Sequence, residues 1–509
     1  MTRLHWPALL ACATLALPAA TPSLIAQSSA SQSTASQSTI ALSTNAADRG
    51  MTAVGDTSGA PFPFALFADA VLANHPVARQ AQAVAEQARA ELRQAWGAFD
   101  PTVTATWDRK TFGGTQYFNY VDAALKIPLP IGADVTVAFD RTLGRYANPD
   151  RLTPGNGTLS AGVSIPLGQR IITDERRTAL QQARAARDLG EADRTGLVNK
   201  LLFSAAKEYG TWYESWRRRA IALEGEALAD FRLRAVRQRV RNGESAPIDT
   251  IEALLEVQRR QVTRFEAEAG FYVATLGITA FLWDSTGAPR PLPAEAKPTI
   301  DGLGNAVIDS TRLDALLAVA VRRHPELLKV QAKVRQAEAE RLLATQGLLP
   351  FAEAKLEALG SRDSETGFFD RARVEDNYKS ALAVKTPLLF LKETGKFGAT
   401  GQKLTMQRLE ADRLRRDVEL ESRAAMFELS NLERLLLRQR ENVRYARLLR
   451  DAEQIRFENG ESTLLILNLR ERLVLDEATK LAALEGKVAG ARGALALATG
   501  DRTLLSIGR

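Results

Sequence analysis

The sequence is poor in the residues that most often carry out chemistry. Among its 509 residues there are one cysteine, Cys12, and three histidines. Cys12 lies in the first apolar stretch and His5 just before it, so a mature chain that begins after this stretch has no thiol for a disulfide, a metal site or a nucleophile. His75 and His324 remain as candidates for a catalytic triad, but the sequence has no nucleophile elbow. We therefore predict that the protein is not an enzyme and holds no cofactor and no metal.

Long apolar runs are missing after the N-terminus. Arg3 followed by the apolar residues 7–20 is typical of a secretory signal peptide, which we place at residues 1–27. This run is too short to span a bilayer, and it continues past Cys12, which argues against a lipoprotein signal. No later segment offers the roughly 18 uncharged apolar residues of a membrane-spanning helix. A membrane role would therefore require a β-barrel.

Neither sign of charge dominates the sequence. It has 67 Lys and Arg against 60 Asp and Glu, and 45% of its residues are apolar. A basic balance can indicate nucleic acid or an anionic membrane surface. Here Arg and Glu are interleaved along helical patterns, so we expect no nucleic-acid partner. The apolar content is sufficient for a large core.

Composition divides the chain into segments. Ser, Thr, Ala and Gln are frequent in residues 28–60, which are typical of a flexible leader, and folding should begin near Pro61. Four prolines between residues 284 and 309 indicate a linker. The predicted segments are a first repeat at 61–284, a linker at 285–308, a second repeat at 309–500 and a tail at 501–509.

An internal repeat is the strongest feature of the sequence. His75-Pro76 returns as His324-Pro325, and a proline follows each histidine by 26 residues. Later in each copy a Pro-Leu pair precedes a long helical pattern, which ends at a glycine turn. These matched landmarks are Pro166-Leu167 with Pro387-Leu388, and Arg241-Asn242-Gly243-Glu244-Ser245 with Glu458-Asn459-Gly460-Glu461-Ser462. The alternative, two unrelated helical stretches, would rarely share this order of landmarks. Because His75 and His324 occupy equivalent positions before proline, a helix-turn role is favoured for both over catalysis or metal binding.

Each copy is predicted to form a helix, strands, a long helix, a turn and a helix. Helices of about 70 residues would be rods of roughly 100 Å, which need partners to bury their apolar stripes. Leu202, Ala206 and Tyr209 begin a run with alternating spacings of four and three, typical of packed helical hairpins. The predicted helices are 65–96, 172–241, 247–284, 311–345, 392–458 and 464–498.

The predicted strands alternate small polar residues with apolar ones. This pattern suits a transmembrane barrel with a wet lumen, and a soluble sheet is the alternative. The alternation is clear in the first copy and weaker in the second. The strands are 101–107, 157–165, 352–359 and 378–384.

The first copy is longer than the second, mainly within its strand region. Between Pro101 and Pro166 it has 28 extra residues, which fit an added hairpin with strands at 120–130 and 133–141. The sequence leaves open whether this hairpin joins the barrel or extends outward as a loop.

Together these landmarks resemble the TolC family of outer-membrane factors, over about residues 62–500. That family has an Asn/His-Pro near the start of each repeat, a Pro-Leu pair before the long helix and a glycine-containing tip. The resemblance implies a mainly α fold with a transmembrane β-barrel portion. It would combine a long α-helical hairpin barrel with strands of a shared trimeric β-barrel, built from two internal repeats. It also implies a homotrimer in outer-membrane lipid with a large periplasmic part, a periplasmic adaptor (membrane fusion) protein and an inner-membrane pump.

The same resemblance marks the helical tips as adaptor-docking sites. Asp249 stands six residues after Gly243, where the family commonly has Asp. It would bind the adaptor or only favour the helix N-terminus electrostatically. The second copy has Ile466 at the equivalent position, and Leu469 stands where some members have an acidic ring. The sequence therefore does not identify the residues that form the gate. The candidate tip residues are Arg241, Gly243, Glu244, Ser245, Asp249, Asn459, Gly460, Glu461 and Ser462.

The function that follows from the resemblance is an outer-membrane channel subunit of a tripartite efflux or type I secretion system. It would be a passive conduit across the periplasm and outer membrane, with energy supplied by the pump. The alternative is a soluble periplasmic coiled-coil scaffold or adaptor, although no lipoyl-like sheet domain is evident between the helices. The sequence determines neither the transported substrate nor the class of pump.

Overall fold

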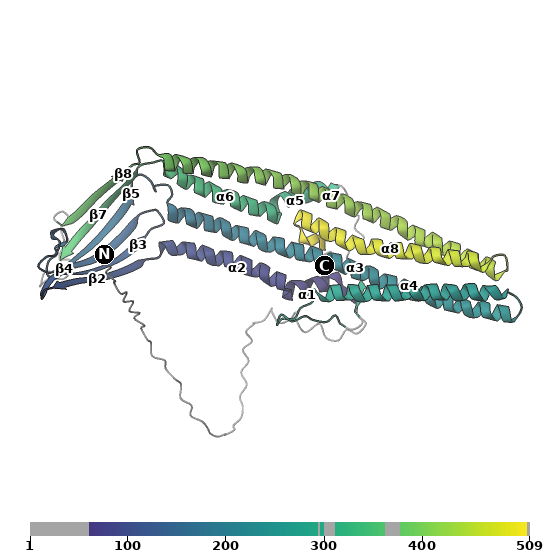
Figure 1. The fold of residues 1–509 in the computed structure, drawn as a ribbon. Coiled ribbons are helices and arrows are strands. Elements are labelled where there is room, and N and C mark those ends of the chain that lie inside the picture. Colours follow the sequence, from purple (N-terminus) through teal and green to yellow (C-terminus); the bar gives the residue numbers. More distant parts are fainter. Residues whose placement is uncertain (1–60, 294–295, 300–310, 362–376, 506–509) are drawn as a thin grey trace, which may run out of the picture. The chain divides into compact units, whose positions relative to one another are not determined.

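The computed structural model describes residues 61–293, 296–299, 311–361 and 377–505. These residues belong to one compact unit. Its strands gather at one end and its helices run away from them (Figure 1). The predicted signal peptide, the leader, and parts of the predicted linker and tail lie outside the described residues.

Eight α-helices are present in the described part of the chain, and α3 and α7 are the longest of them. Their ends agree closely with the predicted turns, because α3 begins at the capping residue Asp174 and ends before Gly243. The helices are α1 (Phe64–Asn74), α2 (Pro76–Trp96), α3 (Glu175–Arg241), α4 (Pro247–Thr279), α5 (Thr311–Arg323), α6 (Pro325–Gln346), α7 (Leu391–Glu458) and α8 (Leu464–Thr499).

Two predicted helices, 65–96 and 311–345, are each broken in two. The breaks lie at His75 and His324, whose backbones are extended, with ψ of 134° and 126°. The following proline has no N–H to continue the first helix and disfavours a helical conformation in the residue before it. The continuous helices predicted from periodicity were therefore wrong at these two positions. His75 also caps α2, because its Nδ1 accepts a hydrogen bond from Val77 N at 3.1 Å.

Six strands form one antiparallel sheet in the order β2-β3-β4-β5-β7-β8. The predicted extra hairpin corresponds to β3 and β4, and both strands lie inside this sheet rather than extending from it. Strands from the two halves of the chain meet where β5 pairs with β7. The strands are β2 (Thr102–Phe112), β3 (Thr115–Pro128), β4 (Asp134–Leu143), β5 (Thr158–Pro166), β7 (Phe351–Ser361) and β8 (Tyr378–Lys385).

Helix α3 is the centre of the helical region. It packs against α2 and α6 near the sheet and against α4 and α8 farther along, while α7 packs against α6 and α8 (Figure 1). The crossing of α3 and α8 is very close at Gly210 and Gly486. A Cβ atom added to Gly210 would lie 2.2 Å from the carbonyl oxygen of Gly486. Only glycine therefore permits this approach of the two backbones.

A buried aromatic cluster joins the ends of the first half to α3. Tyr209 is fully buried, and its hydroxyl donates to Phe62 O at 2.7 Å and accepts from Thr299 N at 3.0 Å. Phe62 and Thr299 belong to the short parallel strands β1 (Pro61–Pro63) and β6 (Lys297–Thr299). Phe67 and Trp212 pack against Tyr209 with ring centroids 5.8 and 5.7 Å away. A single phenol thus ties both strands to the central helix.

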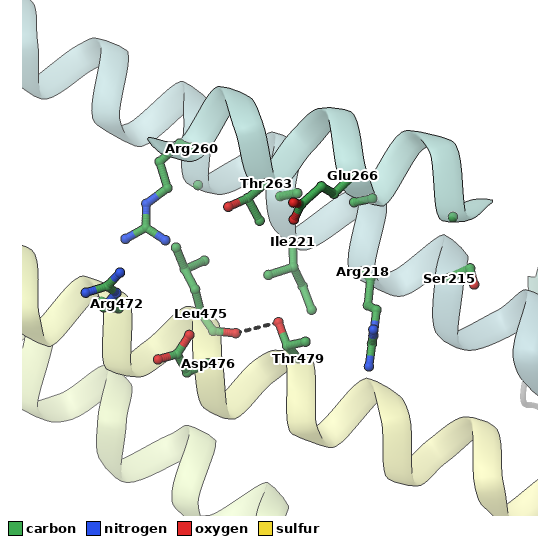
Figure 2. Close-up of a pocket in the computed structure, with 14 residues that line it drawn as sticks. Ser215, Arg218, Ile221, Arg260, Thr263, Glu266, Arg472, Leu475, Asp476 and Thr479 are labelled. Carbon is green, nitrogen blue, oxygen red and sulfur yellow. Dashed lines mark hydrogen bonds between the residues drawn. The ribbon is translucent and has the colours of Figure 1, made fainter. Parts of the chain in front are cut away.

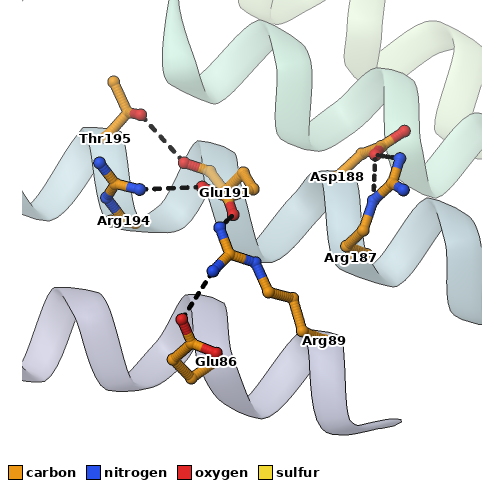
Figure 3. Close-up of polar contacts among 7 residues, drawn as sticks. All are labelled: Glu86, Arg89, Arg187, Asp188, Glu191, Arg194 and Thr195. Carbon is orange, nitrogen blue, oxygen red and sulfur yellow. Dashed lines mark hydrogen bonds and ion pairs between the residues drawn. The ribbon is translucent and has the colours of Figure 1, made fainter. Parts of the chain in front are cut away.

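Ion pairs line the contact between α2 and α3. Arg89 of α2 pairs with Glu86 at 2.6 Å and also with Glu191 of α3, which in turn accepts from Arg194 (Figure 3). These side chains are about half exposed, so water screens each pair and its contribution to stability is small. The association of the two helices rests mainly on small residues, since a Cβ on Gly190 would lie 2.6 Å from the Cβ of Ala88.

We expect Gly210→Ala to lower the free energy of unfolding by roughly 1–3 kcal/mol, because the added methyl must push α3 and α8 apart. The matched control is Gly270→Ala in α4, where an added Cβ meets nothing within 4 Å. That change should be neutral or stabilising by up to about 1 kcal/mol, since alanine favours helix. Denaturant unfolding of the purified protein, followed by circular dichroism, measures both variants. Equal changes of the unfolding free energy in the two variants would contradict the close crossing of α3 and α8.

Candidate functional site

The six-stranded sheet has one apolar face and one polar face. A row across the apolar face, in register from β2 to β8, consists of Val103, Leu125, Val137, Ala161, Ala358 and Tyr378. The adjacent row on the polar face consists of Thr102, Lys126, Thr136, Gly162, Glu357 and Lys379. Because neighbouring residues of a strand point to opposite faces, one face suits an apolar environment and the other suits water.

The polar face carries charges that need water or partners. Asp134 lies 3.0 Å from Lys126 Nζ and 2.9 Å from Arg176 of α3. Glu353 accepts from Ser164 at 2.8 Å, and Lys379 lies 3.9 Å from Glu357. Charged side chains on a lipid-exposed face are destabilising, whereas a wet lumen tolerates them. The polar face therefore requires water or ion-pair partners, as a wet lumen would supply.

The two edges of the sheet lack strand partners within the described residues. Strand β2 pairs only with β3, and β8 pairs only with β7. Large apolar side chains on both edge strands are exposed, including Val103 at 77% and Leu382 at 68%. Open edges with exposed apolar side chains promote pairing with other strands. The sheet is therefore incomplete in a single chain.

The two helical tips have the same backbone geometry. Gly243 and Gly460 take positive φ angles of 82° and 76°. In each tip the glycine N–H and the next N–H bond back to the last turn of the helix, as in a Schellman cap. The predicted tip residues occupy these turns, with Arg241, Gly243, Glu244, Ser245 and Asp249 at the α3–α4 turn and Asn459, Gly460, Glu461 and Ser462 at the α7–α8 turn. Both tips lie at the end of the helices remote from the sheet (Figure 1).

The other residues singled out from the repeat lie where elements change. His75 and His324 precede Pro76 and Pro325, which begin α2 and α6. His324 is buried, and this burial lowers the pKa of its imidazole. Pro166 is the last residue of β5, and Pro387 lies between β8 and α7.

A buried ion pair near the tips joins the two hairpins. Arg232 of α3 pairs with Glu471 of α8, and their side chains are only 11% and 8% exposed. Burial raises the pKa of Glu471 despite the nearby arginines, and it lowers the pKa of Arg232. Arg239 adds a second link, because its guanidinium lies 4.8 Å from the ring centroid of Phe457 in α7. This pair could not be predicted from the sequence, since helix periodicity does not show which charges become buried between hairpins.

The outer side of α4 carries an exposed apolar stripe. It comprises Ile251, Leu255, Val262, Phe265, Tyr272 and Leu276, which are spaced as in a heptad repeat. Among the helices, α4 packs extensively only on α3. The same spacing could have been found in the sequence, where it would have indicated a second helical seam.

A cavity of about 330 Å³ lies between α3, α4 and α8 (Figure 2). Its charged lining residues include Arg218 and Arg260, which pair with Glu214 at 2.7 Å and Glu256 at 2.6 Å. Among the described residues, no cluster of three or more His, Cys, Asp or Glu could hold a metal ion. Ser215, Glu266 and Asp476 also line the cavity.

Known structures share this arrangement. The outer-membrane channel OprN has a TM-score of 0.56 and 17% identity, with 86% of this chain and 89% of that chain covered. The outer membrane protein VceC of Vibrio cholerae (TM-score 0.57, 13% identity) matches over 86% of this chain and 96% of that chain. The outer membrane channel MtrE of Neisseria gonorrhoeae (0.57, 14%) matches over 86% and 88%. This chain has the fold of the outer-membrane channels.

The fold confirms the resemblance to TolC-like outer-membrane factors that the sequence predicts. No family model matches the chain, and no curated protein matches it either. None of the helices in the described ranges is long and apolar enough to cross a membrane.

We expect Arg232→Ala to destabilise the protein by roughly 3 kcal/mol, because it leaves the Glu471 carboxylate buried without its partner. The double variant Arg232→Met/Glu471→Leu should recover most of this loss, since two apolar side chains of similar volume replace the pair. Denaturation midpoints in detergent compare the two variants. If the double variant is no more stable than Arg232→Ala, the loss of stability in Arg232→Ala does not come from leaving a buried charge without its partner.

Proposed function

We propose that the protein is a subunit of an outer-membrane channel that conducts solutes passively across the outer membrane and the periplasm. The observation that carries this proposal is the sheet, which has an apolar face, a charged face and two open edges. Such a sheet is stable when its apolar face meets lipid, its charged face meets water and its edges pair with other chains. The shared fold with outer-membrane channels supports the same conclusion.

Three copies would close the barrel. Each copy supplies six strands, so a trimer supplies eighteen, with β2 of one copy beside β8 of the next. Barrels of roughly 16–18 strands leave an aqueous channel. The exposed stripe on α4 supports the same assembly, because it could pack on α7 of a neighbouring copy. Helix α7 also exposes large apolar side chains, among them Phe427, Leu437 and Leu448.

In the trimer the helices would form a tunnel through the periplasm. The tips, remote from the sheet, would dock a periplasmic adaptor that links the channel to an inner-membrane pump. Asp249 lies in the first turn of α4, within reach of such a partner. The pump would belong to an efflux or type I secretion system, and movement of the α3–α4 and α7–α8 hairpins would open the tunnel.

A soluble periplasmic scaffold or adaptor is the second candidate. The helical hairpins would suit that role. The apolar face of the sheet would then meet water over all six strands, which carries a large hydrophobic penalty. Extraction behaviour separates the two candidates directly.

The channel function predicts an outer-membrane protein that needs detergent for extraction, has the mass of a trimer and forms pores in planar bilayers. Membrane fractionation, mass measurement in detergent and single-channel recording test these points in turn. A monomer that is released without detergent and gives no conductance would contradict the proposal.

The orientation of the sheet has its own test. Leu382→Lys puts a charge on the apolar face of β8, and we expect it to reduce trimer stability by roughly 2–4 kcal/mol if that position is in the bilayer. Ala381→Lys, one residue earlier, puts the same charge on the polar face and should be tolerated. The temperature at which the trimer dissociates in detergent measures both variants. If Ala381→Lys lowers the dissociation temperature more than Leu382→Lys does, the two faces of the sheet are assigned the wrong way round.

A further inference from the structure

The loop between β4 and β5, residues 144–157, folds back over the sheet. Its short helix, Pro149–Arg151, is started by Asn148, whose Oδ1 accepts a hydrogen bond from Asp150 N at 3.1 Å. Arg151 then forms an ion pair of 2.6 Å with Asp122 of β3. Its guanidinium also lies 4.4 Å from the ring centroid of Tyr120, whose hydroxyl accepts from Asn148 N at 3.1 Å. These three contacts attach the loop to β3.

All of these attachment points are on the polar face. Asp122 is in register with Thr106 and Asp140 on that face, and Tyr120 lies two residues away on the same side. Thr142, also on the polar face, is only 4% exposed beneath the loop, and its N–H donates to Thr153 Oγ1 at 2.9 Å. The segment from Asn148 to Thr153 therefore lies over the charged face of the sheet at this end, whereas Gly155 O of the same loop accepts from Arg141, whose register position is on the other face.

The backbone at both ends of the loop is built for this turn. Gly144 and Gly157 have φ angles of 126° and 87°, which only glycine adopts without strain. A Cβ on Gly144 would lie 2.6 Å from Phe118 Cα, and one on Gly157 would lie 2.5 Å from the Phe139 ring. Both glycines thus direct the chain against the sheet.

The position of the loop along the sheet is also fixed. Strand β4 begins beside α3, where Asp134 pairs with Arg176. Its other end, from which the loop leaves, is the end away from the helices (Figure 1). If the helices stand in the periplasm, this end faces the outside of the cell.

We propose that the β4–β5 loop is a constriction inside the channel, held across its outer opening by the pairing of Arg151 with Asp122 and Tyr120. The inference rests on the proposed function, because it requires the polar face to line the lumen. A barrel of eighteen strands would leave a broad aqueous opening, and three such loops, one from each copy, would narrow it. The loop would set the largest size of hydrophilic solute that reaches the lumen from outside.

Cysteine labelling tests this directly, since Cys12 is the only natural cysteine. Thr136→Cys places a thiol on the polar face, deeper than the loop, and Val137→Cys places one on the apolar face. Intact cells are treated with a small membrane-impermeant maleimide or with a large polyethylene-glycol maleimide. Cells that make the chain without an added cysteine give the background. With the native loop, Thr136→Cys should react readily with the small reagent and slowly with the large one.

In the Thr136→Cys background, Arg151→Ala should raise the rate with the large reagent several-fold and leave the rate with the small one nearly unchanged. Removal of residues 147–154 should have the same effect. Asp122→Arg should also release the loop, and Asp122→Arg/Arg151→Asp should restore the restriction by reversing the pair. Arg145→Ala, in the same loop but without an ion pair in the described structure, is the matched control and should have no effect.

The outcomes distinguish a failure of the proposed constriction from a failure of the proposed channel function. If Thr136→Cys reacts with the small reagent but neither Arg151→Ala nor the shortened loop changes the rate with the large one, the constriction is wrong and the channel stands. If Val137→Cys reacts with the small reagent and Thr136→Cys does not, the polar face does not line a lumen, and the proposed function fails as well. Trimer migration on gels confirms the folding of each variant.

Discussion

The unpaired edges of the six-stranded sheet are the constraint on which the rest of the structure depends. Strands β2 and β8 each leave one row of backbone groups without a strand partner in the described residues. A sheet with one apolar face cannot place that face in lipid while its edges stay open, because unpaired backbone groups are costly in a bilayer. Other copies of the chain resolve this most simply, since they supply β8 to β2 and β2 to β8. The trimer that we propose is therefore a consequence of the sheet.

In the proposed trimer, the helices would continue the barrel as a long tunnel. Helix α3 continues from β5 and holds the other helices by close contacts, most clearly where Gly210 meets Gly486. Tyr209 fixes the segment after α4 to the same helix. Near the tips the buried pair of Arg232 and Glu471 lies beside a buried apolar cluster that includes Ala229, Leu233 and Leu464.

Much of this fold could be predicted from the sequence because its signals are local. Gly243 and Gly460 end the long helices where their spacing indicates, and the alternating residues of β5 mark it as a strand. The breaks at His75 and His324 were missed because apolar periodicity continues across them. The place of β3 and β4 within the sheet depends on how they pair with β2 and β5. The sequence of the hairpin alone does not determine this pairing. The same applies to Arg232 with Glu471 and to the loop contact of Arg151 with Asp122, which form only when distant segments meet.

The most direct test of the account is whether β2 of one copy pairs with β8 of the next. Thr106→Cys in β2 can be combined in turn with single cysteines at positions 379 to 385 in β8, and each pair can be oxidised in outer membranes. If β2 and β8 of neighbouring copies pair, at least one cysteine pair gives covalent dimers and trimers on non-reducing gels, while variants with a single cysteine give only monomers. Monomers throughout, from protein that is present and folded, would contradict it.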